Sequence, residues 1–150
     1  MATQAIATQR EGAEVYTGEE LCKKKSLELL QELHLPSGLL PLTDLEEVGR
    51  NKETGFVWLK QKKSTTHNFK SIGKTVSYAT EVTAFVEDRR MKRMTGVKSK
   101  EILIWVSLSD MSIDDPEHKK ITFKTSAGIG RSYPVQAFEE EEGKKEEEGK

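Results

Sequence analysis

Cysteine is almost absent from this sequence, with Cys22 the only one in 150 residues. A single cysteine cannot form an intramolecular disulfide or supply a zinc site made of cysteines alone. No apolar run approaches the roughly 20 residues of a membrane-spanning helix, and residues 1–16 hold no apolar core of secretory-signal length. These absences predict a soluble protein located in the cytoplasm, with no transmembrane segment.

Histidine is also scarce, and the three that occur are His34, His67 and His118. No two of them lie at the spacing of metal ligands, and there is no Gly-x-Ser-x-Gly turn of the kind that presents a catalytic serine. The segment 128–130 lacks the third glycine of a dinucleotide-binding loop. The sequence therefore predicts no metal site and no cofactor, and it identifies no catalytic residue.

The net charge of −1 conceals an uneven distribution of charge along the chain. Residues 60–100 hold eleven basic and three acidic residues, whereas residues 139–150 hold seven Glu and three Lys. A run of charged residues such as 139–150 is typical of a solvated tail. We expect a flexible N-terminal arm at 1–16, a single β-rich domain at 17–138 and a disordered acidic tail at 139–150.

The strongest pattern in the chain is the alternation of apolar and polar residues that starts at Val76. Alternation with β-branched and aromatic residues indicates a strand, so 75–87 is the longest predicted strand. A turn at 87–90 then leads into a second strand at 91–97, which gives an antiparallel hairpin. The run Ile102 to Leu108 is apolar on both faces, and this predicts a central strand buried on both sides.

Shorter elements complete the predicted domain. Further strands are expected at 56–60, 68–73, 121–125 and 131–138. A helix is expected to begin near Thr17, where Thr17 and Glu20 fit a capping box, and to end near His34. Residues 44–50 suit a short helical turn, and the leucines of the loop 36–42 are expected to pack against the core.

These elements predict a mainly β protein. The expected architecture is an antiparallel β-barrel or sandwich of about 7–10 short strands with one N-terminal α-helix. Short strands joined by turn residues are typical of this architecture. A sheet with one apolar face must cover that face, and it does so by closing into a barrel or by stacking on another sheet.

Several segments also carry a family resemblance. They are Leu35-Pro36-Ser37-Gly38-Leu39-Leu40-Pro41, Glu53-Thr54-Gly55-Phe56, Val76-Ser77-Tyr78, Glu81-Val82-Thr83-Ala84, Thr95-Gly96-Val97-Lys98-Ser99-Lys100-Glu101 and Ile121-Thr122-Phe123-Lys124-Thr125. In this order the chain resembles, over residues 21–138, the plant family catalogued as domain of unknown function 538. The resemblance implies a β-rich barrel-like or sandwich fold, a plant source and stress-related expression. It also implies either lipid binding, as in the bactericidal/permeability-increasing protein, or hydrolysis of chlorophyll esters.

A cluster of basic residues at the turn after the longest strand is one candidate site: Arg89, Arg90, Lys92 and Arg93. Clustered Lys and Arg attract anionic lipid surfaces, and they also suit an acidic partner or the acidic tail of this chain. The alternative is a solvated face that protects strand edges from aggregation. Nucleic acid is not favoured as a partner, because aromatic residues are not interleaved as a base-stacking platform requires.

Three aromatic residues, Phe56, Trp58 and Trp105, are candidates for the lining of an apolar pocket. The alternative is that they are ordinary core residues, since small barrels usually fill their interiors with side chains. The leading hypothesis is a monomeric binding module for a lipid-like or apolar small molecule, or for an anionic surface. The alternatives are an esterase-like hydrolase and a regulatory adaptor with no ligand.

Overall fold

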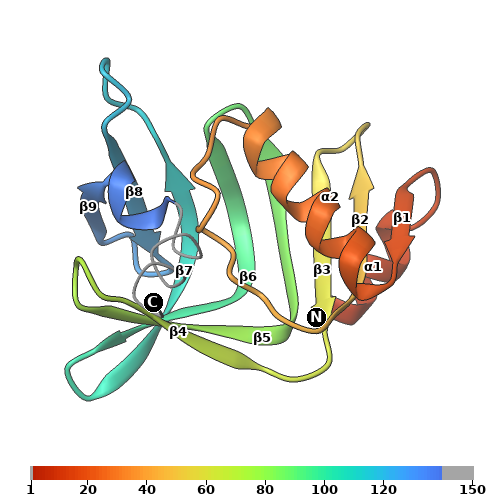
Figure 1. The fold of residues 1–150 in the computed structure, drawn as a ribbon, viewed down its shortest axis with the longest axis horizontal. Helices are drawn as coiled ribbons and strands as arrows, with labels where there is room; N and C mark the ends of the chain where they lie inside the picture. Colours follow the sequence, from red (N-terminus) through yellow and green to blue (C-terminus); the bar gives the residue numbers. More distant parts are fainter. Residues whose placement is uncertain (1, 140–150) are drawn as a thin grey trace, which may run out of the picture.

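The computed structural model describes residues 2–139, in which nine strands form one antiparallel sheet (Figure 1). The strand order is β1-β2-β3-β5-β6-β7-β8-β9, and β4 pairs with β5 beside this path. The strands are β1 (Glu14–Thr17), β2 (Leu45–Asn51), β3 (Phe56–Gln61), β4 (Thr65–Phe69), β5 (Lys74–Glu87), β6 (Arg90–Glu101), β7 (Ile104–Ser112), β8 (Lys120–Thr125) and β9 (Gly130–Pro134). The helices are α1 (Ala2–Gln9), α2 (Glu19–Glu32) and the 3-10 helix η1 (Val135–Phe138). The predicted mainly β, antiparallel fold is confirmed.

The sheet is open and strongly bent. Within the described residues the outer strands β1 and β9 do not pair with each other, so the sheet is not a closed barrel. The bend falls in the long hairpin of β5 and β6, where the pairing register shifts between Tyr78 and Thr83. Opposite this shift Gly96 has a φ of 84°, and a Cβ there would collide with the carbonyl oxygen of Glu81. Bulges of this kind increase local twist and curl a sheet.

The bend divides the sheet into two halves that share β5. The second half of β5 pairs with β3, and its first half pairs with β4. Strand β4 spans 65–69, so only the beginning of the predicted strand 68–73 is correct, and its remainder is the β4–β5 turn. In Figure 1 helix α2 lies over β2 and β3, while β8 and β9 curl round on the other side of the molecule.

The main core lies between the sheet, α2 and the loop that follows α2. Helix α2 buries Cys22, Leu29 and Leu30 against this core. The loop leucines Leu39, Leu40 and Leu42 are buried there too, at 2%, 7% and 8% exposure, which confirms their predicted position. No helix among residues 2–139 is both long enough and apolar enough to span a membrane.

The start of α2 differs from the sequence prediction. The helix begins at Glu19, and its N-cap residue is Gly18, which makes no side-chain hydrogen bond to the helix. Thr17 instead ends β1, which pairs with β2. The predicted capping box is therefore not formed, because sheet pairing holds Thr17 in extended geometry.

A second, smaller core on the opposite face of the sheet consists of Ile6, Phe56 and Trp58. Helix α1 supplies Ile6, which is only 2% exposed. Thus residues 1–16 are not wholly a flexible arm, since α1 and β1 both occur there. The prediction overlooked α1 because it carries a single large apolar residue. It also placed a helical turn at 44–50, where β2 is held as a strand between β1 and β3.

The predicted hairpin of 75–87 and 91–97 is confirmed as β5 and β6, but the predicted central buried strand from Ile102 to Leu108 is wrong. Glu101 pairs with Ile104, so the chain reverses at Ile102 and Leu103. These two turn residues are 93% and 89% exposed. The apolar run therefore begins at a projecting hairpin end, and only Leu108 reaches the core.

Candidate functional site

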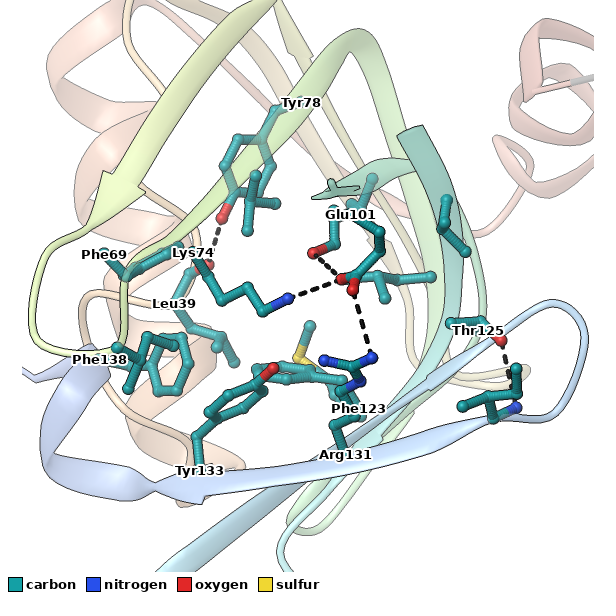
Figure 2. A pocket seen from close by; sticks show the side chains of 18 residues that line it. Leu39, Phe69, Lys74, Tyr78, Glu101, Phe123, Thr125, Arg131, Tyr133 and Phe138 are labelled. Atoms are coloured by element: carbon teal, nitrogen blue, oxygen red, sulfur yellow. Dashed lines mark hydrogen bonds and ion pairs between the residues drawn. The ribbon is translucent and has the colours of Figure 1, made fainter. Parts of the chain in front are cut away.

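An apolar cavity of about 120 Å³ lies within the curled half of the sheet (Figure 2). Strands β4 to β7 wall one side of it, and β8, β9, η1 and the loop leucine Leu39 close the other. The described lining residues are Leu39, Phe69, Ile72, Lys74, Val76, Tyr78, Val97, Ser99, Glu101, Val106, Leu108, Met111, Phe123, Thr125, Ile129, Arg131, Tyr133 and Phe138. A dry cavity of about 150 Å³ holds one benzene molecule. The cavity therefore has room for one ring or the end of an alkyl chain.

Aromatic rings form the wall of the cavity beside η1. Phe138 is 2% exposed, and its ring centroid lies 4.8 Å from that of Phe69, 5.2 Å from that of Phe123 and 6.4 Å from that of Tyr133. These edge and tilted contacts are the arrangements that aromatic pairs prefer. Helix η1 thus sets one wall of the cavity through a single residue.

Tyr78, a buried tyrosine in the cavity lining, has a neutral hydroxyl. Tyr78 donates a 3.1 Å hydrogen bond from its hydroxyl to the carbonyl oxygen of Leu39. Burial raises the pKa of the Tyr78 hydroxyl far above its ordinary value, because the charged form would be desolvated. Tyr78 therefore positions the loop after α2 and offers no charge to a ligand.

A charged group stands at the mouth of the cavity, where Figure 2 shows Lys74 and Arg131 converging on Glu101. Lys74 Nζ lies 2.8 Å from Glu101 Oε2, and Arg131 lies 3.4 Å from Oε1. The hydroxyl of Ser99 donates to the same carboxylate at 3.2 Å. The hydrogen bond from Lys74, with the charges of Lys74 and Arg131, lowers the pKa of Glu101. Two cations around one carboxylate leave the mouth with an excess of positive charge.

The structure does not bring the three predicted pocket aromatics together. Phe56 and Trp58 lie in the second core beneath α1, with ring centroids 6.1 Å apart. Trp105 lies near the end of the β6–β7 hairpin and is 42% exposed, with Lys100 Nζ 5.8 Å from its ring centroid. The cavity is lined by other residues, which sequence reasoning missed because they come from segments between Leu39 and Phe138.

The predicted basic cluster lies at the β5–β6 turn, and three of its four members contact carboxylates. Arg89 lies 2.7 Å from Asp88, Arg90 lies 3.4 Å from Asp114, and Lys92 lies 2.7 Å from Glu87. The guanidinium of Arg93 lies over the ring of Phe85 at 5.6 Å. Much of the positive charge of the turn is therefore offset locally. Asp114 could not be foreseen as a partner, because it belongs to the distant β7–β8 connection.

His34 lines a separate, shallow hollow, and its ring contacts a carboxylate that is not among the described lining residues. The Nδ1 atom of His34 lies 2.6 Å from Oδ1 of Asp88, and this contact holds the pKa of Asp88 below its ordinary value. Ser37 and His118 line the same hollow. His34 and His118 both adopt positive φ angles, of 60° and 57°, a conformation that is often found at functional sites.

Comparison with known proteins gives one match. The model of the family described as a protein of unknown function, DUF538, matches residues 26–139. This range includes every described residue that lines the cavity or the hollow at His34. No curated protein and no solved structure matches the chain.

Proposed function

The chain belongs to this family of proteins of unknown function, and we propose that it is a binding module for a small amphipathic molecule with an anionic head. The observation that supports the proposal is the cavity, which combines an apolar interior with a positively charged mouth. Ligand sites in proteins are typically apolar hollows with a few convergent polar groups.

The interior of the cavity suits the apolar end of such a molecule. Its deeper lining includes Leu39, Val97, Leu108 and Met111, all of them 7% exposed or less. Tyr78 already uses its hydroxyl within the protein. A polar group placed at this depth would lose its hydration without gaining a partner, so the interior selects alkyl chains or unsubstituted rings.

The mouth suits an anionic head. Arg131 is the most exposed member of the charged group, with 58% of its side chain accessible, against 18% for Lys74. An incoming anion at Arg131 would therefore meet a guanidinium that presents several donors at once. Glu101 would repel an anion, yet it is already engaged by both cations.

The proposal is tested by calorimetric titration with a pair of amphiphiles that share one chain and differ in the charge of the head. Octyl sulfate should bind more tightly than octyltrimethylammonium, and the difference should shrink as salt screens the mouth. The variant Arg131→Gln should reduce the difference in affinity between the two amphiphiles. Arg93→Gln, near the end of β6 that is remote from Glu101, should leave this difference unchanged. Equal binding of the two amphiphiles, or binding of neither, would contradict the proposal.

Blocking the interior gives a second test. The variant Val97→Phe should fill the cavity and abolish octyl sulfate binding, and Leu27→Phe on the exposed side of α2 should not. Thermal unfolding of both variants distinguishes a filled cavity from a lost fold. Retained binding in a folded Val97→Phe protein would show that the ligand sits elsewhere.

An esterase-like hydrolase is the second candidate, and the hollow around His34 is the observation that favours it. The hollow places Ser37 with a histidine that contacts Asp88, the residue types of nucleophilic acyl transfer. The described lining of the apolar cavity, by contrast, contains no histidine. Hydrolysis of p-nitrophenyl butyrate that is lost in both Ser37→Ala and His34→Gln would support this candidate. Activity unaffected by either change would remove it.

A further inference from the structure

The β6–β7 hairpin ends in four consecutive apolar residues that face solvent. Ile102, Leu103, Ile104 and Trp105, here called the apolar tip, are 93%, 89%, 63% and 42% exposed. Contiguous exposed apolar patches on a protein surface mark sites of protein or membrane contact. The apolar tip is therefore a surface that the fold leaves uncovered, although its residues are the kind that normally enter a core.

The apolar tip projects beyond its neighbours. Strand β8 follows β7 only as far as the pair Leu108 and Thr125, and the next contact is the hydrogen bond from Ser126 N to Ser107 O at 3.0 Å. Between Ser107 and Leu103 the hairpin continues for about 13 Å at the usual rise per strand residue. In Figure 1 this hairpin extends outward at the lower left, below the β4–β5 hairpin.

Basic residues surround the base of the apolar tip. The β4–β5 turn (69–74), the end of the β6–β7 hairpin (98–107) and the β8–β9 turn (125–131) together hold five basic residues and one acidic residue. The acidic residue, Glu101, contacts two of the five, Lys74 and Arg131. The remaining charges are Lys70, Lys98 and Lys100, and each of these lysines is exposed. This surface is thus apolar at its end and positive around it.

We propose that the apolar tip docks the protein on a bilayer that contains anionic lipid. Ile102 and Leu103 enter the acyl region, and Trp105 lies at the level of the headgroups, where tryptophan is enriched in membrane proteins. Lys98 and Lys100 contact the headgroups, because clustered basic residues are attracted to an anionic leaflet. Stable membrane association generally needs two such signals, and this one hairpin supplies both.

Docking in this orientation brings the cavity to the membrane surface. Ile72, Glu101 and Ile129 line the cavity, and they belong to the same three turns that surround the apolar tip. The proposal does not depend on the cavity holding a ligand, since it stands on the exposure and charge of the hairpin. Membrane docking and amphiphile binding can therefore fail separately.

The two tryptophans make the docking measurable. Trp58 is fully buried, whereas Trp105 is 42% exposed, so a change of tryptophan emission on adding vesicles reports on the apolar tip. With vesicles of phosphatidylcholine and phosphatidylserine, the emission should shift to the blue and be quenched by brominated acyl chains. The variant Trp105→Phe should lose this signal and still float with the vesicles.

Vesicle flotation of variants tests which groups are responsible. The variant Ile102→Ser/Leu103→Ser should lower partition into the mixed vesicles by about tenfold or more. Its control, Leu21→Ser/Leu27→Ser, changes two leucines of α2 that are 42% and 39% exposed, and it should bind as the parent does. Binding to the mixed vesicles, and its dependence on salt, should be weaker in Lys98→Gln/Lys100→Gln. Neither should change in Lys62→Gln/Lys63→Gln, which alters the exposed β3–β4 connection.

Three results would overturn the proposal. They are no flotation at low salt, equal flotation with phosphatidylcholine alone, and unchanged flotation of a folded Ile102→Ser/Leu103→Ser protein. Sedimentation of the parent without vesicles tests the alternative that the apolar tip binds a second copy of the chain. Suppose that the parent self-associates, that Ile102→Ser/Leu103→Ser does not, and that neither of the two proteins binds vesicles. The apolar tip is then an interface between copies of the chain, and the membrane proposal is wrong.

Discussion

The indole Nε1 of Trp58 donates a 2.8 Å hydrogen bond to Oε1 of Glu47 on the neighbouring strand. Arg10, which follows α1, donates to the same oxygen at 2.8 Å, and its guanidinium lies 5.4 Å from the centroid of the Trp58 ring. One carboxylate therefore joins the N-terminal segment to the sheet. This contact fixes the residue that follows α1 beside Trp58, on the face where α1 covers the second core.

The Glu47 contact predicts that acid weakens the fold. The hydrogen bond from Arg10, aided by that from Trp58, lowers the pKa of Glu47 below its ordinary value, which is about 4.3 in an unfolded chain. The stabilisation is therefore complete above the unfolded pKa and is lost as the pH falls through the lower, folded pKa. Urea unfolding across an acidic pH series measures this loss.

The variant Glu47→Gln isolates that contribution from those of other carboxylates. Its free energy of unfolding at neutral pH should fall by about 1 kcal/mol, a small value because solvent screens a partly exposed ion pair. The difference between parent and variant should vanish at low pH. Exposed Glu46→Gln is the matched control, and parallel pH curves for the parent and Glu47→Gln would contradict the account.

Gly49 is predicted to tolerate no side chain. It pairs directly with Trp58 across β2 and β3, and a Cβ at Gly49 would collide with the indole ring. Overpacking of this kind costs about 1–3 kcal/mol, so Gly49→Ala should lower the urea midpoint. Gly130→Ala, whose Cβ would meet only ordinary contacts, is the control. The cost should shrink in a Trp58→Phe background, and an equal cost in both backgrounds would show that the ring is not the cause.

Phe138 is predicted to be a principal support of the cavity wall. Removal of its ring would leave Phe69 and Phe123 without their shared partner, and large-to-small changes of a buried phenylalanine cost about 3–5 kcal/mol. Phe138→Ala should therefore unfold at a clearly lower temperature, with Phe138→Leu between it and the parent. Unchanged thermal unfolding of Phe138→Ala would mean that η1 does not hold the wall.

Cys22 is predicted to be unreactive in the folded protein. Its side chain is fully buried, and its thiol donates a 3.3 Å hydrogen bond to the carbonyl oxygen of Tyr16. Burial raises the pKa of the Cys22 thiol, which lowers the fraction present as the reactive thiolate. Ellman's reagent should react slowly with native protein and rapidly in urea, and prompt reaction without urea would contradict the buried position.

The local pattern of the sequence predicted the fold better than the site. Alternation from Val76 identified the β5–β6 hairpin, because a strand with one buried face repeats every two residues. The same reasoning wrongly predicted a buried strand from Ile102, because a short apolar run has the same sequence pattern in a buried strand and in an exposed hairpin end. Only the pairing of Glu101 with Ile104 distinguishes them, and pairing is a long-range property.

The cavity lay beyond prediction for a related reason. Its residues are ordinary core types, and what creates the space is the bend at Gly96 together with the return of Phe138 to the sheet. Residual volume depends on how distant segments pack. The positive mouth was equally hidden, because Lys74, Glu101 and Arg131 meet only once three hairpins are in place. The predicted acidic tail at 139–150 lies almost entirely outside the described residues.

Methyl-resolved NMR with octyl sulfate can show whether the cavity is the binding site, because it locates the bound alkyl chain. We expect intermolecular contacts from the alkyl chain to the methyl groups of Val97, Leu108 and Met111, and shifts of the Arg131 side-chain signals near the sulfate. Val48, a buried residue of β2 that does not line the cavity, should not respond. Contacts confined to other methyl groups, or none at saturating ligand, would contradict the claim that the cavity is the binding site.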